Sequence, residues 1–251
     1  MYIDTHCHLS CEDYDDIDLV VKENKENGIE KMIISGCTKD SILESIQLSK
    51  KYDDIYLTIG YHPSEVNFVR DEDLLSLKEL LMSVPKIVGV GEIGLDYHYD
   101  KELKYAQIEL FEKQLALAEE LHLPVIIHSR DATEDTIRCL KKYDVHGVIH
   151  CFSGSVETAR IYTSMGYLLG IGGVVTFKNS NLYKVVEELG LSSIVLETDS
   201  PYLAPVPYRG QKNSSKYIPI IAKKVAEISG TSESEVAQLT TTNACRLFDL
   251  S

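Results

Sequence analysis

Two histidines stand one residue apart near the start of the chain, in the stretch MYIDTHCHLS. Tyr2 and Ile3 are typical of a short buried strand, and successive side chains of a strand point to opposite faces. His6 and His8 therefore point to the same side, while Cys7 between them points away. Two imidazoles on one side can bind one metal ion, so this stretch predicts a metal site.

Ionisable residues also follow apolar runs elsewhere, in the segments GYHP, GEIGLD, IIHSR, IHCFSG and LETDSP. The side chains concerned are His62, Glu92, His128, His150 and Asp199. If each run is a strand of a parallel barrel, its carboxyl end lies at the catalytic face. We expect all of them to converge with His6 and His8 on one pocket. Each has a plainer explanation: a histidine can bond to loop backbone, Glu92 can form a buried ion pair, and Asp199 can cap a turn.

Strands and helices alternate along the whole sequence. Apolar runs predict strands at residues 1–4, 31–36, 55–60, 86–91, 124–128, 147–150, 167–171 and 193–197. Apolar residues at three- and four-residue steps predict helices, for example over residues 103–121. Eight strands separated by helices predict an α/β protein with a (β/α)8 TIM barrel, the alternative being an open doubly wound sheet. No linker divides residues 1–251, so we expect a single domain.

Composition narrows the class of protein. Apolar residues make up 44% of the chain, and 39 acidic against 25 basic residues give a net charge of −14. A long nucleic-acid groove is therefore unexpected, because such grooves are basic, although metal cations can supply local positive charge for a phosphate substrate. With no leader and no long apolar window, we expect a cytoplasmic protein without a membrane segment. The six scattered cysteines are expected to be free thiols.

The ligand set exceeds what one ion needs. Four histidines, one glutamate and one aspartate suit two divalent ions such as zinc or manganese, with Glu92 as the candidate bridge between them. Two ions can acidify a shared water and neutralise charge on attacking and leaving oxygens, which is what phosphoester hydrolysis requires.

Several other residues are candidates for substrate binding. His62 and Arg130 could contact phosphate oxygens, although Arg130 could equally form a salt bridge to Asp131 or Asp135. Tyr202 could stack on a base or pack its loop, and Arg209 could bind phosphate or serve only solubility.

The order of the sequence blocks is informative. DTHCHL, GYHP, GEIGLDY, PVIIHSRDA, IHCFSG, LETDSPYLAP and NACRLF closely resemble the TatD family of metal-dependent deoxyribonucleases, from Tyr2 to about Phe248. The resemblance implies a TIM barrel of the metallo-dependent hydrolase group. It assigns His6, His8, Glu92 and Asp199 to one metal site. It assigns Glu92, His128 and His150 to the second.

The resemblance also implies roles and a substrate. Asp199 matches the residue that positions or deprotonates the attacking water, and His62 matches one that contacts substrate. Relatives are described as DNases, often acting at the 3′ end of single-stranded DNA, or as esterases on mischarged tRNA, and the usual ion is magnesium. Ser10 departs from the acidic residue of many relatives at a peripheral position. We expect a monomer acting on single-stranded DNA ends, because the charge of −14 suits a chain end better than a duplex.

Two alternatives remain. An amidohydrolase or esterase of the same barrel group would often bridge its metals with a carbamylated lysine on the fourth strand, where Lys86 sits at the wrong end. A non-catalytic metal-binding barrel would use its ligands for stability alone, although strand tips are poorly placed for that role.

Overall fold

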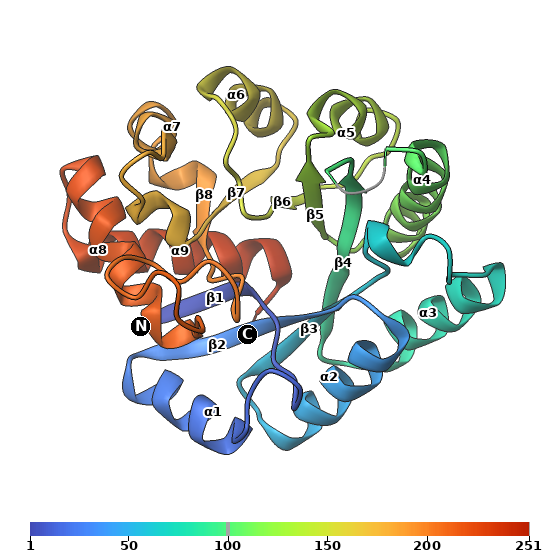
Figure 1. The fold of residues 1–251 in the computed structure, drawn as a ribbon, viewed down its shortest axis with the longest axis horizontal. Helices are drawn as coiled ribbons and strands as arrows, with labels where there is room; N and C mark the ends of the chain where they lie inside the picture. The colour runs from blue at the N-terminus through green and yellow to red at the C-terminus, as the bar shows by residue number, and fades with distance from the viewer. Residues whose placement is uncertain (99–100, 251) are drawn as a thin grey trace. The chain divides into compact units, whose positions relative to one another are not determined.

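The computed structural model describes residues 1–98 and 101–250. Eight strands alternate with helices along the chain (Figure 1). The chain forms two compact units: the first unit is Met1–Ile34 with His150–Ser251, and the second unit is Ser35–Ile149. That residues 1–251 form a single domain stays a prediction.

The first unit contains two pairs of parallel strands. β1 (Tyr2–Cys7) pairs with β2 (Ile29–Gly36), and β7 (Leu168–Ile171) pairs with β8 (Ile194–Leu196). β2 belongs to this unit as far as Ile34. The Thr5 hydroxyl donates a hydrogen bond to the carbonyl of Leu196 at 3.0 Å, which ties β1 to the end of β8.

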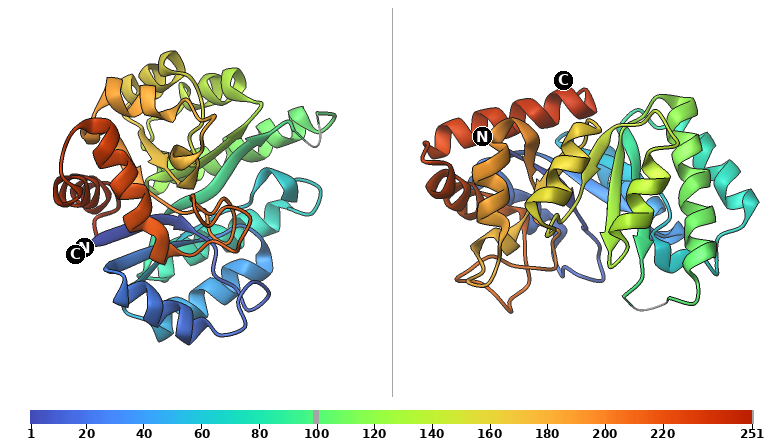
Figure 2. Two further views of the ribbon diagram at one scale, coloured as in Figure 1. Left: turned by 60° about the vertical axis from the view of Figure 1, so that its left-hand side comes forward. Right: turned by 90° about the horizontal axis from the view of Figure 1, so that it is seen from above.

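Helices of the first unit cover these strands. They are α1 (Ile17–Glu26), α6 (Val156–Ser164), α7 (Leu182–Leu189), α8 (Ile218–Ser229) and α9 (Glu233–Phe248), with the short helices η2 (Gly173–Thr176), η3 (Leu191–Ser193) and η4 (Ser215–Tyr217). Figure 2 shows α8 and α9 side by side, and α9 packs on both β1 and β8. Val225 and Val236, both fully buried, belong to the apolar faces of these two helices.

The second unit is a parallel sheet with four helices. Its strands pair in the order β3 (Ile55–Ile59), β4 (Ile87–Asp96), β5 (Val125–Arg130) and β6 (Gly147–Ile149). Its helices are α2 (Lys39–Lys51), α3 (Asp71–Ser83), α4 (Lys104–Leu121) and α5 (Thr133–Leu140), with η1 (Pro63–Glu65) after β3. α4 packs on β4 and beside α5. Among the described residues of both units, no helix is long and apolar enough to cross a bilayer.

Four strands extend beyond the predicted apolar runs. β2 begins at Ile29, two residues earlier than predicted, and β5 continues past His128 to Arg130. β1 continues past Asp4 to Cys7, and β4 continues past Gly91 to Asp96. The predicted ends were wrong because polar side chains inside a strand were taken as its end. His6 and Glu92 therefore lie within strands, where the backbone fixes the direction of their side chains.

Candidate metal centre

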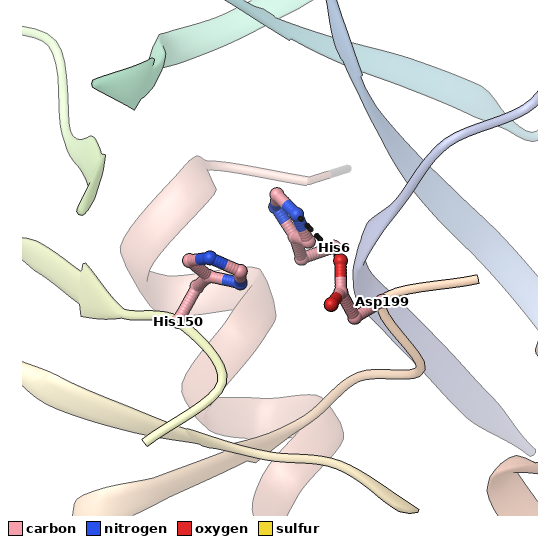
Figure 3. Close-up of side chains that lie close together, drawn as sticks. All are labelled: His6, His150 and Asp199. Atoms are coloured by element: carbon pink, nitrogen blue, oxygen red, sulfur yellow. Dashed lines mark ion pairs between the residues drawn. The ribbon is translucent and has the colours of Figure 1, made fainter. Parts of the chain in front are cut away.

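A first cluster of possible metal ligands lies in the first unit and consists of His6, His8, His150 and Asp199. One ligand atom each from His6, His150 and Asp199 lies within 4.8 Å of the others. Figure 3 shows these three side chains directed toward one another, and the rings of His6 and His150 are 4.1 Å apart between centroids. His6 is fully buried and His150 nearly so.

Backbone hydrogen bonds between β1 and the segment after β8 position this cluster. The N–H of Asp199 donates to the carbonyl of His6 at 3.0 Å, and the N–H of His8 donates to the carbonyl of Ser200 at 2.7 Å. Asp199 Oδ1 consequently lies 3.5 Å from Nε2 of His6 and 3.6 Å from Nε2 of His8. The prediction that His6 and His8 share one side is confirmed by this common partner.

Neighbouring histidines keep the carboxyl group of Asp199 ionised. Burial alone raises the pKa of this carboxyl, but the imidazoles of His6 and His8 outweigh burial and hold the pKa well below its usual range. The side chain is therefore ionised at neutral pH, as a carboxylate metal ligand must be.

Asp4 supports the cluster from behind, and sequence reasoning missed it. Its carboxylate is fully buried and accepts hydrogen bonds from the Thr198 N–H at 3.0 Å, the Thr198 hydroxyl at 2.5 Å and the His6 N–H at 3.3 Å. Burial raises its pKa to about 7. Asp4 thus fixes the segment carrying Asp199 against the strand carrying His6.

Glu197 was also missed, although LETDSP contains two carboxylates. It is fully buried; Oε1 accepts a hydrogen bond from the Cys151 N–H at 2.5 Å and lies 3.6 Å from Nδ1 of His150. Metal-binding histidines commonly present their second nitrogen to a carboxylate, which fixes the ring orientation. Glu197 is placed to do this for His150, leaving Nε2 for an ion.

A second cluster lies in the second unit and consists of His62, Glu92, Asp96 and His128. The His128 ring lies between two carboxylates of β4, with Nδ1 2.7 Å from Oε1 of Glu92 and Nε2 3.1 Å from Oδ2 of Asp96. Glu92 and Asp96 share a face of β4 because strand side chains alternate. The ring of His62 lies 4.6 Å from that of His128, and its Nε2 lies 3.9 Å from Oε1 of Glu92.

Asp96 is another site residue that the sequence analysis missed, because the predicted strand ends at Gly91 and β4 continues to Asp96. Burial raises its pKa, but the bonds from the His128 ring and the His98 N–H outweigh burial, so the pKa lies below its ordinary value. The strand alternation of GEIGLD would have revealed it, since Glu92 and Asp96 are four positions apart.

The predicted substrate-binding residues lie in different places. Tyr202 is exposed, with its ring 6.1 Å from that of His8, and the guanidinium of Arg209 stacks on Phe177 at 4.5 Å. Arg130 ends β5 with an exposed side chain.

The two salt-bridge partners considered for Arg130 both pair with other residues: Oδ2 of Asp131 lies 3.1 Å from Nδ1 of His98, and Asp135 pairs with Lys104 at 2.5 Å and Arg138 at 2.7 Å. A substrate role for Arg130 stays a prediction. Convergence of both clusters on one pocket also stays a prediction.

The donor atoms of both clusters fit divalent cations. The first cluster offers imidazoles with a carboxylate, and the second offers imidazoles with two carboxylates. Neither cluster contains a cysteine, and imidazoles combined with carboxylates are the ligand set of borderline ions such as zinc and manganese.

Comparison with known proteins identifies relatives along the whole chain. The family model for TatD related DNase matches residues 3–249. The metal-dependent hydrolase YabD of Bacillus subtilis is 43% identical over 253 residues, which covers 99% of both chains. YcfH of Escherichia coli, also described as a metal-dependent hydrolase, is 35% identical over 99% of this chain and 96% of its own length.

A solved structure agrees with the family match. The crystal structure of YjjV, the TatD homologue of Escherichia coli K12, superposes with a TM-score of 0.93 at 31% identity, covering 100% of this chain and 98% of that one. The predicted α/β class and (β/α)8 fold are confirmed by this likeness. The chain therefore belongs to the TatD related DNase family and is a metal-dependent hydrolase.

Proposed function

We propose that this protein is a two-metal phosphodiesterase that removes nucleotides from the 3′ end of single-stranded DNA. The observation that carries the proposal is the first cluster, in which Asp199 lies between His6 and His8 and beside His150. Active sites of (β/α)8 enzymes lie at the carboxyl ends of the strands, and Asp96 at the end of β4 and Asp199 just after β8 have such positions. The bridging role of Glu92 stays part of the proposal.

Residues of the two clusters would together hold two divalent cations, supplied as magnesium, manganese or zinc, with the ligands divided as the family resemblance implies. Bound cations supply Lewis acidity, which lowers the pKa of a water ligand and neutralises phosphate charge. His6, His8 and Asp199 would hold one ion, while Glu92, His128 and His150 would hold the other. The lowered pKa of Asp199 makes its carboxylate a weak base. Asp199 is therefore better suited to orient the attacking water than to accept its proton.

Substrate contacts would come from residues beside the ligands. Tyr202 exposes 59% of its surface next to His8 and can stack a base of the terminal nucleotides. Arg130, Arg209 and His62 would contact phosphate oxygens. A net charge of −14 favours contact with a few terminal phosphates over a long groove.

The test is release of mononucleotides from a 5′-labelled single strand with manganese. We expect products shortened from the 3′ end, no release in EDTA, and at least about 100-fold slower release for Glu92→Gln and Asp199→Asn, since ligands matter more than their outer partners. Glu227→Gln, an exposed change on α8, is the matched control.

Undiminished release by the two variants, or release that persists in EDTA, would contradict the mechanism. Dihydropyrimidine and p-nitrophenyl acetate serve as further substrates in the same assay. Hydrolysis of either one, with oligonucleotides untouched, would favour the amidohydrolase or esterase alternative.

A further inference from the structure

Helix α4 carries two buried glutamines, Gln107 and Gln114, which the proposed chemistry does not use. They expose 3% and 0% of their surface. Their seven-residue spacing is close to two helical turns, so both carboxamides lie on the same face of α4. A buried carboxamide needs hydrogen-bond partners. Gln107 finds them in the backbone of β4, and Gln114 finds them in the backbone of the segment just after β3.

Gln107 forms hydrogen bonds with both backbone groups of Asp96, its N–H and its carbonyl. Its Oε1 accepts the Asp96 N–H at 2.9 Å, and its Nε2 donates to the Asp96 carbonyl at 2.8 Å. The next N–H along the chain, that of Tyr97 just after β4, donates to the carbonyl of Arg130 at the end of β5, so the backbone groups of Asp96 face the opposite edge. β3 pairs with β4 only as far as Val90, and Gln107 therefore takes the place of the missing strand.

Gln114 likewise forms hydrogen bonds with both backbone groups of one residue, Tyr61, just beyond the end of β3. Its Oε1 accepts the Tyr61 N–H at 2.7 Å, and its Nε2 donates to the Tyr61 carbonyl at 3.0 Å. Tyr61 precedes His62, so the carboxamide holds the backbone from which the His62 side chain starts.

Both glutamines thus act on backbone that carries a member of the second cluster. The Asp96 carboxylate bonds to Nε2 of His128, and this leaves Nδ1 toward Glu92. His62 lies against the His128 ring. A small shift of either backbone would move these groups. Within the described residues the pairing of β3 with β4 ends at Ile59 and Val90, so the two carboxamides supply the hydrogen bonds that a strand would supply at that edge.

We propose that Gln107 and Gln114 are positioning residues of the metal centre. Gln107 acts through Asp96 on the ligand geometry of His128, and Gln114 acts through Tyr61 on His62. The inference rests on the proposed function in that it takes His128 as a ligand and His62 as a substrate contact. It predicts different effects for the two: loss of metal affinity for Gln107, and slower turnover with unchanged metal affinity for Gln114.

A purely structural role is the competing explanation, and the chain offers a matched control. Asn243 on α9 is 7% exposed, and its Nδ2 donates to the carbonyls of Leu191 and Ile194, both at 2.9 Å. It also joins a helix to strand backbone, but at the amino end of β8, away from the strand ends that carry the clusters.

The experiment compares Gln107→Met, Gln114→Met and Asn243→Leu in the full chain. It measures thermal unfolding of the metal-free protein, calorimetric titration with Mn²⁺, and kcat and KM on bis(p-nitrophenyl) phosphate. We expect all three variants to unfold at a lower temperature than the wild type. Gln107→Met should lose about tenfold or more in affinity for one Mn²⁺ equivalent. Gln114→Met should keep both affinities and lose about tenfold in kcat.

Asn243→Leu should keep the affinities and kcat of the wild type. Equal effects of all three changes on binding and kcat, or wild-type binding and kcat for both glutamine variants, would overturn the inference. Where Gln107→Met does not fold, Gln107→Asn keeps the carboxamide with a shorter reach and carries the same prediction.

The imidazole ¹⁵N shifts of His128 in the metal-free protein give a readout independent of turnover. They should change in Gln107→Met and not in Asn243→Leu; unchanged shifts in both would count against the inference. A wild type that binds Mn²⁺ but leaves the phosphodiester intact would refute the proposed function, while the titration and the shifts would still decide the role of Gln107.

Discussion

At the scale of single residues, Gly170 on β7 makes room for the Glu197 carboxylate. A Cβ at position 170 would lie 2.1 Å from Oε2 of Glu197, far inside van der Waals contact. Glu197 is fully buried beside Nδ1 of His150, so it has little space into which to move. The absence of a side chain at Gly170 is therefore required for the orientation of His150.

Gly170→Ala should destabilise the protein by about 1–3 kcal/mol, the usual cost of overpacking. Because Glu197 must shift, the variant should also bind Mn²⁺ more weakly than the wild type. Thermal unfolding and calorimetric titration measure the two effects.

Gly172→Ala is the control for this change. A Cβ at position 172 meets its nearest atom at 3.6 Å, which is ordinary contact, and its φ of −106° suits any residue. If the two alanine variants behave alike, the packing argument for Glu197 is wrong.

At the scale of elements, the sequence predicts the strands well and their ends poorly. Apolar runs are sufficient to locate every strand, because a strand covered on both faces excludes water from most of its length. The ends of β1 and β4 differ because Asp4, Glu92 and Asp96 remain in the strand through hydrogen bonds to distant segments. Such partners are tertiary, so no local pattern reveals them.

The same reason explains which site residues were found. His6, His8, Glu92 and Asp199 stand out in short motifs. Asp4 and Glu197 do not, because their roles depend on Thr198 and Cys151, whose backbone groups reach them only in the folded chain.

Asp135 connects three elements of the second unit. Oδ2 accepts hydrogen bonds from Lys104 at the start of α4, at 2.5 Å, and from the Tyr97 hydroxyl after β4, at 3.0 Å. Oδ1 accepts from Arg138 on α5 itself at 2.7 Å. The bond from Lys104 lowers the pKa of Asp135 most strongly, against the opposing effect of burial.

Asp135→Asn should lower the free energy of unfolding by about 1.5–3 kcal/mol at pH 7, the range for hydrogen bonds to a charged group. A carboxyl with a depressed folded-state pKa stabilises above its unfolded pKa, about 3.9, and this contribution is lost as pH falls through the folded pKa. The difference in unfolding free energy between wild type and variant should therefore have its largest value at pH 6–7 and shrink below about pH 4.

Urea unfolding at several pH values measures that difference. Asp144→Asn, at an exposed loop position, should show no comparable loss. A difference for Asp135→Asn that stays constant down to pH 3 would show that its charge does not stabilise the connection between α4 and α5.

At the scale of the whole molecule, the order of motifs along the chain is enough to predict the (β/α)8 fold and the family. Eight apolar runs alternate with helical patterns, and the motif blocks extend to both ends of the chain. The number of ions and the identity of the substrate depend on how donor atoms from distant segments share a cation, which a linear pattern does not contain.

The overall charge of −14 leads to a prediction about nucleic-acid binding. A protein that contacts Z phosphates of a single strand shows a slope of about −0.7Z in log K against log salt. With two arginines proposed to bind phosphate, the slope should be about −1 to −2 for a labelled twenty-nucleotide strand. Fluorescence anisotropy with the Asp199→Asn variant, in a fixed concentration of Ca²⁺, measures this slope over a series of KCl concentrations.

A six-nucleotide strand should bind nearly as tightly as the twenty-nucleotide strand, because only terminal nucleotides are held. A slope steeper than about −4, with affinity rising along the length of the strand, would instead require a long phosphate-binding surface.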